Sequence, residues 1–247
     1  MRWAAIVGGA LGLFVIGALI LVLLAPIPVV GPAATPPAAP TWAPPGPVPD
    51  AAADPGAGNQ TRVDAAWAER TAAATGIPVR ALVAYAGAAM FKADQMPECA
   101  ISWSTLAGVG MIESHHGTYG GSALDEGGTA VPGIFGIALD GVTTANVPDS
   151  DDGAIDGDPD NDRAVGPMQL IPQTWKNWHV DGGGDGVEDP QNIDDAATAA
   201  ANYLCRSSTA MDTEAGWRAA VSAYNSSDTY LSNVAAAAES YNAAVGG

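Results

Sequence analysis

The sequence predicts an all-α, or strongly α-dominated, globular domain, and three observations support this. Hydrophobic residues make up 48% of the 247 residues, and many of them are alanine, which suits closely packed helices. From about residue 61 onward, apolar side chains recur at the three- and four-residue spacing of a helix face. No alternating apolar and polar run is long enough to predict a strand.

The N-terminal segment differs in composition from the rest of the chain. Arg2 is followed by residues 3–25, which carry no charged side chain, and about 20 apolar residues are enough to cross a bilayer. A cleaved secretory signal has a shorter apolar stretch, of about 7–15 residues. We therefore expect an uncleaved transmembrane anchor over residues 1–25, and Arg2 places its N-terminal side in the cytoplasm by the positive-inside tendency.

This anchor determines the expected domain organisation and location. Residues 26–60 are rich in Pro, Ala and Gly, which predicts an extended extracytoplasmic linker. The globular domain is expected over residues 61–247. The chain is thus predicted to be a single-pass protein of the plasma membrane, with its globular domain outside the cytoplasm.

Six helices are expected in the globular domain. Proline at 78 suits the first position of a helix, and Asp194 and Asp195 precede another helix as capping residues. Residues 120–162 are rich in Gly and Asp without clear periodicity, which predicts a long loop; such loops are uncommon unless functional or disordered. The expected helices span 63–74, 78–86, 101–113, 196–205, 213–224 and 229–244.

The charge balance restricts the classes of partner. The chain has 27 acidic and 9 basic residues, for a net charge of −18. Nucleic acid would be repelled, because its phosphates need clustered Lys and Arg side chains. Many of the acids fall in two runs, 149–162 and 181–195. These runs predict solvated loops or, as the alternative, metal sites.

The cysteines and histidines do not predict zinc. Two cysteines, Cys99 and Cys205, cannot complete a structural zinc site unaided. An exported domain favours a disulfide between them, and the alternative is a pair of buried thiols. His115 and His116 are adjacent, but no third ligand is placed beside them, and neighbours on a helix point apart.

Glu113 is the candidate for acid–base chemistry. It stands at the end of the apolar helix expected over 101–113. Loss of water around a carboxyl group raises its pKa and keeps it protonated as a general acid. The alternative is a surface Glu at a helix end, although the helix dipole disfavours a negative charge there.

Two further motifs carry polar side chains suited to a ligand. In residues 163–175, Gly and Pro allow a sharp turn, and Gln169 offers a donor and an acceptor that suit sugar amides and hydroxyls. The alternative is a turn that enters a helix. Tyr224 and Asn225 pair an aromatic ring with an amide that would hold the face and edge of a sugar, and the alternative is a helix C-cap by Asn225.

The three motifs follow one another in a defined order. They are Gly-x-x-Glu-Ser-x-x-Gly over 110–117, Ala-Val-Gly-Pro-Met-Gln-x-Ile-Pro-x-Thr-Trp over 164–175, and Ala-Tyr-Asn over 223–225. Together they resemble the lytic murein transglycosylases, most of all the membrane-bound B type in the form found in high-GC Gram-positive bacteria. The resemblance covers roughly residues 75–245.

The resemblance implies a lysozyme-like helical fold that binds the glycan strands of peptidoglycan, with Glu113 as its one catalytic residue. It also implies that a Cys99–Cys205 bridge ties together two helices beside the cleft. No cofactor is required for the implied reaction. The implied substrate contacts are Ser114, Met168, Gln169, Tyr203, Tyr224 and Asn225.

The implied reaction needs one carboxyl group where most glycosidases use two. Glu113 would protonate the oxygen between MurNAc and GlcNAc, and the neighbouring N-acetyl carbonyl would stabilise the sugar cation. The ionised Glu113 would then deprotonate the C6 hydroxyl, which gives a 1,6-anhydroMurNAc end. The alternatives are a lysozyme-type hydrolase that produces reducing ends and a catalytically silent peptidoglycan-binding module.

The second acidic run partly matches a calcium-binding loop. Asp181 and Asp185 stand at the first and fifth positions of an EF-hand loop, with Gly at the sixth. The third position is Gly, and the twelfth is Asn192 and not Glu, so the strict motif fails. The resembled family has a longer loop, which implies calcium ligands from Asp181, Asp185, the Val187 carbonyl and Asp195. The alternative is a turn capped by the last acids of the run.

Overall fold

The computed structural model describes residues 39–246. The anchor predicted over 1–25 lies outside the described residues, as does the first part of the predicted linker. In the described part of the chain, no single helix has the length and apolar composition of a membrane span. The two helices over 65–75 and 79–95 meet those criteria only as a pair, and they are bent by 117° at the break between them.

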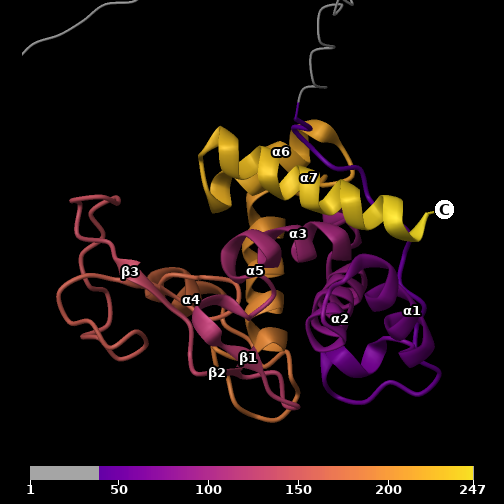
Figure 1. The fold of residues 1–247 in the computed structure, drawn as a ribbon, viewed down its shortest axis with the longest axis horizontal. Coiled ribbons are helices and arrows are strands. Elements are labelled where there is room, and N and C mark those ends of the chain that lie inside the picture. The colour runs from indigo at the N-terminus through magenta and orange to yellow at the C-terminus, as the bar shows by residue number, and fades with distance from the viewer. Residues whose placement is uncertain (1–38, 247) are drawn as a thin grey trace, which may run out of the picture. The chain divides into compact units, whose positions relative to one another are not determined.

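Within residues 39–246, seven α-helices form the body of the molecule (Figure 1). All six predicted helices are confirmed, with ends that differ by a few residues except at α2, which runs on to Gln95. The seventh, α4, is a short helix after the Gly-Pro turn. The helices are α1 Ala65–Thr75, α2 Val79–Gln95, α3 Trp103–Ser114, α4 Pro172–Trp178, α5 Ile193–Ser207, α6 Glu214–Tyr224 and α7 Asp228–Val245.

Helix α3 lies in the middle of the body, between α2, α5 and α7. It is apolar on all sides, and a helix of that kind is stable only when other elements cover it. Trp103, Leu106 and Val109 are accordingly buried. Gly108 allows α7 to approach closely, because a Cβ there would lie 2.8 Å from the carbonyl oxygen of Val234.

The helix starts show how local hydrogen bonds set the elements. The Ser102 hydroxyl accepts a hydrogen bond from the Thr105 N–H and caps α3. At α5 the cap is Asn192, whose side chain accepts from the Asp194 N–H. The prediction that Asp194 and Asp195 precede this helix is therefore wrong. Both acids lie in its first turn, where the helix dipole favours negative charge.

The predicted long loop over 120–162 contains strands that the sequence did not reveal. Within the described residues, β1 (Ala123–Leu124) pairs with β2 (Ala130–Val131), and β3 (Phe135–Ala138) pairs with β4 (Arg163–Val165), both antiparallel. The strands have two to four residues, which is too short for an alternating pattern. The segment around β3 projects to one side of the helices (Figure 1).

The described part of the predicted linker, residues 39–60, contacts the helices and is not a free extended segment. Ala43 is buried. The Trp103 indole N–H donates to the Pro47 carbonyl at 2.8 Å, and the Asn242 amide donates to the Pro44 carbonyl at 2.8 Å. Each bond satisfies a polar group at the edge of the core, so the packed domain begins well before residue 61.

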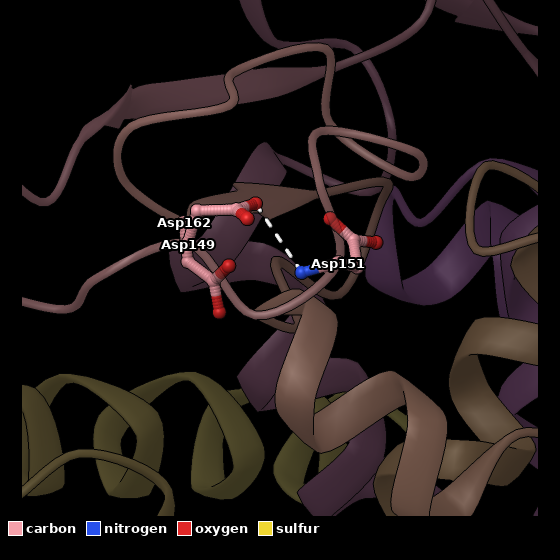
Figure 2. Close-up of side chains that lie close together, drawn as sticks. All are labelled: Asp149, Asp151 and Asp162. Carbon is pink, nitrogen blue, oxygen red and sulfur yellow. Dashed lines mark hydrogen bonds between the residues drawn. The ribbon is translucent and has the colours of Figure 1, made fainter.

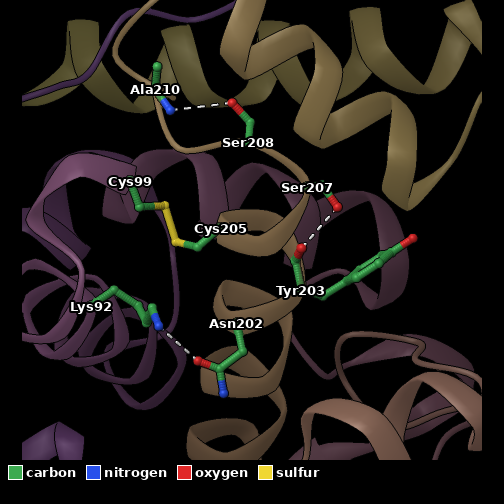
Figure 3. Close-up of a disulfide and its surroundings, with 8 residues drawn as sticks. All are labelled: Lys92, Cys99, Asn202, Tyr203, Cys205, Ser207, Ser208 and Ala210. Atoms are coloured by element: carbon green, nitrogen blue, oxygen red, sulfur yellow. Dashed lines mark hydrogen bonds between the residues drawn. A yellow bond between two sulfur atoms is a disulfide. The ribbon is translucent and has the colours of Figure 1, made fainter.

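The disulfide between Cys99 and Cys205 is confirmed (Figure 3). It joins the short 3₁₀ helix η2 (Pro97–Cys99), which precedes α3, to the last part of α5. The two Cα atoms lie 5.3 Å apart, and both side chains are buried. One turn away, the buried Lys92 ammonium donates to the Asn202 side chain at 3.1 Å, so the α2–α5 contact has a polar link beside the covalent one.

Candidate active site

Helix α3 brings Glu113 to its C-terminal end, where the chain turns sharply. His115 and His116 both have positive φ, 51° and 61°, which costs free energy for non-Gly residues unless the surroundings hold them. The His116 ring is buried and contacts the hydroxyls of Tyr85 at 3.2 Å and Tyr241 at 3.0 Å. His116 therefore anchors the end of α3 to α2 and α7 and does not line an open surface.

Glu113 is partly exposed, and its carboxylate accepts a hydrogen bond from the Tyr230 hydroxyl at 2.5 Å. Burial raises the pKa of Glu113 to about 7, and the Tyr230 hydrogen bond opposes this shift without cancelling it. A carboxyl group with a pKa close to neutrality populates both its acid and its base form, which is the condition for general acid–base catalysis.

A row of aromatic rings leads away from Glu113 across α7, α6, α5 and α4. Tyr230 stacks on Tyr224 with ring centres 6.5 Å apart and an angle of 6° between the planes. Tyr224 lies 5.7 Å from Tyr203, which lies 6.3 Å from Trp178. Trp178, Tyr203 and Tyr224 are partly exposed. The row therefore offers ring surface to a ligand next to Glu113.

Sequence reasoning missed two members of this row, Tyr230 and Trp178. Tyr230 lies in a helix that was predicted, and only one feature of the sequence distinguishes it from an ordinary core residue. Its distance from Tyr224, six residues along the chain, was the one available signal: the pair spans the α6–α7 corner next to the Ala-Tyr-Asn motif. Trp178 belongs to α4, the helix that was not predicted.

The Gly-Pro-Met-Gln segment forms a tight turn between β4 and α4. Val165 and Leu170 exchange backbone hydrogen bonds across it at 2.9 and 3.1 Å. Gly166 has φ 72°, and a Cβ there would lie 1.7 Å from the Pro190 carbonyl oxygen, so glycine is required. Gln169 also has positive φ, is partly exposed and donates from its side chain to the Gly166 carbonyl at 3.0 Å.

The side chains of two further predicted substrate contacts, Ser114 and Met168, are buried, at 1% and 0% exposure. The Ser114 hydroxyl donates to the Pro167 carbonyl at 2.6 Å and accepts from the Gly117 N–H at 2.8 Å. The Met168 carbonyl accepts from the Tyr224 hydroxyl at 2.6 Å. Both residues support the site from beneath: they join the turn to Glu113 on one side and to the aromatic row on the other.

Asn225 lies at the end of α6, directly after Tyr224, and is exposed. Its side-chain oxygen accepts a hydrogen bond from the Ser227 N–H at 3.0 Å, which fits a role at the turn into α7. The structure thus places Glu113, Gln169, Tyr203, Tyr224 and Asn225 around one end of α3. Contact of these side chains with a substrate stays a prediction.

The predicted calcium loop places three carboxylates beside Gly183. A Cβ on Gly183 would lie 3.6 Å from Oδ1 of Asp195, 3.9 Å from Oδ1 of Asp181 and 4.0 Å from Cγ of Asp185. The space that glycine leaves open is therefore bordered by hard oxygen ligands, which suit Ca²⁺. Burial, with a smaller contribution from the nearby Asp181, raises the pKa of Asp195 to about 6 against the effect of three backbone N–H donors. Val187, whose backbone carbonyl is the fourth predicted calcium ligand, is exposed. Its part in calcium binding stays a prediction.

The first acidic run also folds into a cluster (Figure 2). Asp149, Asp151 and Asp162 bring one oxygen each to within 4.8 Å of one another. The fully buried Asp162 accepts from the N–H and hydroxyl of Ser150, and Asp149 accepts from the N–H groups of residues 151–153. The acids thus replace regular secondary structure in holding this loop together.

The comparisons with known proteins concern the second half of this site. Residues 162–243 match the family model described as Transglycosylase SLT domain. No curated protein and no solved structure matches the chain. The transglycosylase match contains the Gly-Pro turn and the whole aromatic row, and it begins after Glu113. Such a domain implies cleavage of the glycan strands of peptidoglycan.

Proposed function

We propose that this protein is a peptidoglycan lytic transglycosylase that cleaves the MurNAc-β-1,4-GlcNAc bond with Glu113 as its only acid and base. The observation that carries the proposal is the environment of Glu113. Its partly buried carboxyl group has a pKa of about 7 and accepts a hydrogen bond from Tyr230, the first residue of the aromatic row. The transglycosylase SLT match over 162–243 supports the substrate class.

The reaction follows from the protonation state of this carboxyl group. Protonated Glu113 donates its proton to the glycosidic oxygen as the bond from C1 of MurNAc breaks, and the GlcNAc hydroxyl leaves. The N-acetyl carbonyl of MurNAc stabilises the electron-poor C1. Ionised Glu113 then removes the proton from the C6 hydroxyl, whose oxygen bonds to C1 and forms the 1,6-anhydro ring. The proton returns to Glu113, and no water is consumed.

The surroundings of Glu113 favour a single-carboxylate reaction over a two-carboxylate one. Burial and the Tyr230 hydroxyl account for the pKa shift of Glu113, and the effect of burial prevails. A carboxyl group that populates both forms near neutral pH can act first as the acid and then as the base. Tyr230 holds the Glu113 carboxylate in place, and the rings of Tyr224 and Tyr203 offer surfaces on which the sugar units would stack.

We also propose a membrane anchor over residues 1–25, which places the domain beside the cell wall, and a structural calcium ion between Asp181, Asp185, Asp195 and the Val187 carbonyl. The ion would neutralise converging negative charge and fix the loop that precedes α5. The chemistry at Glu113 does not require it, and no other cofactor is needed.

The test is digestion of purified peptidoglycan by the full chain in detergent, followed by mass analysis of the released muropeptides. Products with 1,6-anhydroMurNAc ends, lighter by one water than reducing ends, support the proposal. Reducing ends would mean a lysozyme-type hydrolase. Binding without release would mean a silent binding module.

Glu113→Gln is the matched variant, and Glu239→Gln is its control. Gln keeps the shape of the carboxyl group but cannot donate or accept the proton. Glu239 is an exposed carboxylate on α7, the same helix that carries Tyr230, so its change tests for unspecific effects of lost charge. Release by the wild type and by Glu239→Gln, but not by Glu113→Gln, is expected.

A further inference from the structure

A hollow of about 230 Å³ lies in the segment that follows α3. One wall is η3 (Tyr119–Gly121) with Ser122, and the other is the run from Pro132 to Phe135. Tyr119 and Phe135 line it and are 59% and 45% exposed. No lining residue carries a charge. The hollow is lined by Tyr119, Gly120, Ser122, Pro132, Gly133, Ile134 and Phe135.

Exposed large hydrophobic side chains are concentrated in this one segment. Eight such side chains occur in the described part of the chain, and five of them fall between residues 119 and 142. Scattered exposed apolar residues need no explanation, but a local group indicates a binding surface. The two aromatic members, Tyr119 and Phe135, both border the hollow; the others are Val131, Ile137 and Val142.

Both walls of the hollow are tied to residues beside Glu113. The wall at 119–122 follows the end of α3, where the Thr118 N–H donates to the Ser114 carbonyl at 3.0 Å. In the other wall, the Ile134 carbonyl accepts from the Gly166 N–H at 2.9 Å. Since Ser114 also donates to Pro167, the two walls and Glu113 share one hydrogen-bonded support. The hollow therefore rests on the same hydrogen-bonded segments as the candidate active site.

We infer that this hollow is a further sugar-binding subsite, in which Tyr119 and Phe135 hold one ring of the glycan strand away from the bond that is cleaved. The inference rests on the proposed function and names a binding site for the same substrate. Aromatic rings supply rigid apolar faces for the C–H face of a pyranose, and the Tyr hydroxyl supplies a polar edge. The peptide stems of peptidoglycan carry ionised groups, which this uncharged lining would not pair.

The test compares glycan lengths with a matched pair of variants on β3. Phe135→Ala removes a ring from the hollow. Ile137→Ala removes an exposed side chain (65% exposed) from the same strand but outside the hollow. On long glycan strands, Phe135→Ala should lower kcat/KM by about 5–20-fold, largely through KM, since one stacked ring contributes on the order of 1–2 kcal/mol. The loss should be smaller on a tetrasaccharide, and Phe135→Tyr should restore most of it.

Equal effects of Phe135→Ala and Ile137→Ala, or equal losses on long and short glycans, would overturn the inference. Circular dichroism confirms that each variant is folded. Binding of long strands to Glu113→Gln and to Glu113→Gln/Phe135→Ala separates the two proposals. If no strand is cleaved but Phe135→Ala still weakens binding, the subsite stands and the catalytic proposal fails. If strands are cleaved and binding does not change, only the subsite fails.

Discussion

The carboxylates of this chain occupy two contrasting environments, represented by Glu113 and Asp149. Glu113 lies at the end of an apolar helix, accepts one hydrogen bond from a phenol, and burial raises its pKa to about 7. Asp149 lies in a Gly- and Asp-rich loop. Desolvation acts on Asp149 as well, but the N–H groups of Gly153, Asp152 and Asp151 outweigh it and hold its pKa below the usual value.

The difference shows that the number of acids in a region says little about catalysis. Seven acidic residues lie in the run 149–162. Most of their carboxylates accept hydrogen bonds from backbone N–H groups and so hold together a loop that has little regular secondary structure. The single Glu113 is surrounded by apolar and aromatic groups that stabilise its neutral form. The pKa of a reactive carboxyl group is thus raised by the elements that bury it. The pKa of a structural one is lowered by the backbone N–H groups of its own loop.

The largest expected effect contrasts the two carboxylates directly. Glu113→Gln should lower the rate of glycan cleavage by about 10³-fold or more, and at pH 8 it should raise the free energy of unfolding by about 1–3 kcal/mol. Glu113 has a raised pKa when folded, so its ionisation costs stability as pH rises from about 4.5 to 7. Urea denaturation at pH 4 and pH 8 measures this, and the gain should vanish at pH 4.

Asp149→Asn should change stability in the opposite direction. The pKa of Asp149 is lowered in the folded state, so its ionised form contributes stability above the unfolded pKa, and that stability is lost as pH falls through the folded pKa. The variant should therefore unfold at a lower urea concentration than the wild type at pH 8 and cleave glycans at the wild-type rate. A stabilised Asp149→Asn would refute the contrast between the two sites.

The pH dependence of the wild type should give the next largest effect. Because Glu113 must begin the reaction as an acid, the rate should fall as pH rises through its pKa of about 7. The loss approaches about tenfold per pH unit well above that value, and amounts to about 50-fold between pH 7 and pH 9. Initial rates of muropeptide release across pH 5–9 measure it. A rate that still rises above pH 8 would exclude Glu113 as the general acid.

Tyr230→Phe should have a smaller effect on the rate, about tenfold, by removing the hydroxyl that holds the Glu113 carboxylate. Since that hydrogen bond lowers the pKa of Glu113, the fall in rate at high pH should move to a higher pH. Tyr203→Phe is the control, because its hydroxyl donates to the Ala223 carbonyl and not to Glu113. The assignment fails if both variants shift the pH profile equally.

The sequence predicted the helices well because their apolar spacing is local information. Residues 101–113 were expected to be a buried helix that ends at Glu113, and α3 has that form. The sequence did not separate the exposed side chains of the candidate site from the buried ones. Ser114 and Met168 belong to conspicuous motifs, but only the folded structure shows that they are buried.

Short elements and distant partners were not predictable for a different reason. The strands β1–β4 and the helix α4 have too few residues to show a period, and each strand forms only because another segment pairs with it. Tyr230 meets Glu113 across 117 residues of sequence, and nothing local to either residue encodes that contact. The contacts of residues 39–60 with α3 and α7 are equally non-local.

The last expected effect, on stability and not on the rate, concerns the second acidic run, where converging carboxylates are held apart by backbone N–H groups. If Ca²⁺ binds between Asp181, Asp185 and Asp195, it should raise Tm, because a ligand at 100 times its Kd adds about 2.7 kcal/mol to the stability of the folded state. Asp195 strengthens this expectation: burial raises its pKa to about 6, so at pH 7.5 the ion would offset the cost of its ionisation.

Thermal unfolding with EDTA, Ca²⁺ or Mg²⁺ measures the calcium effect, and Asp181→Asn should abolish the response to Ca²⁺. The control is Glu188→Gln in the same loop, since the Glu188 carboxylate pairs with His179 and not with the three acids. A calcium response that survives Asp181→Asn but disappears in Asp151→Asn would move the ion to the cluster of Asp149, Asp151 and Asp162. In that case a bound cation, and not only the backbone N–H groups, would stabilise the ionised form of Asp149. The contrast between Glu113 and Asp149 would then have a second cause.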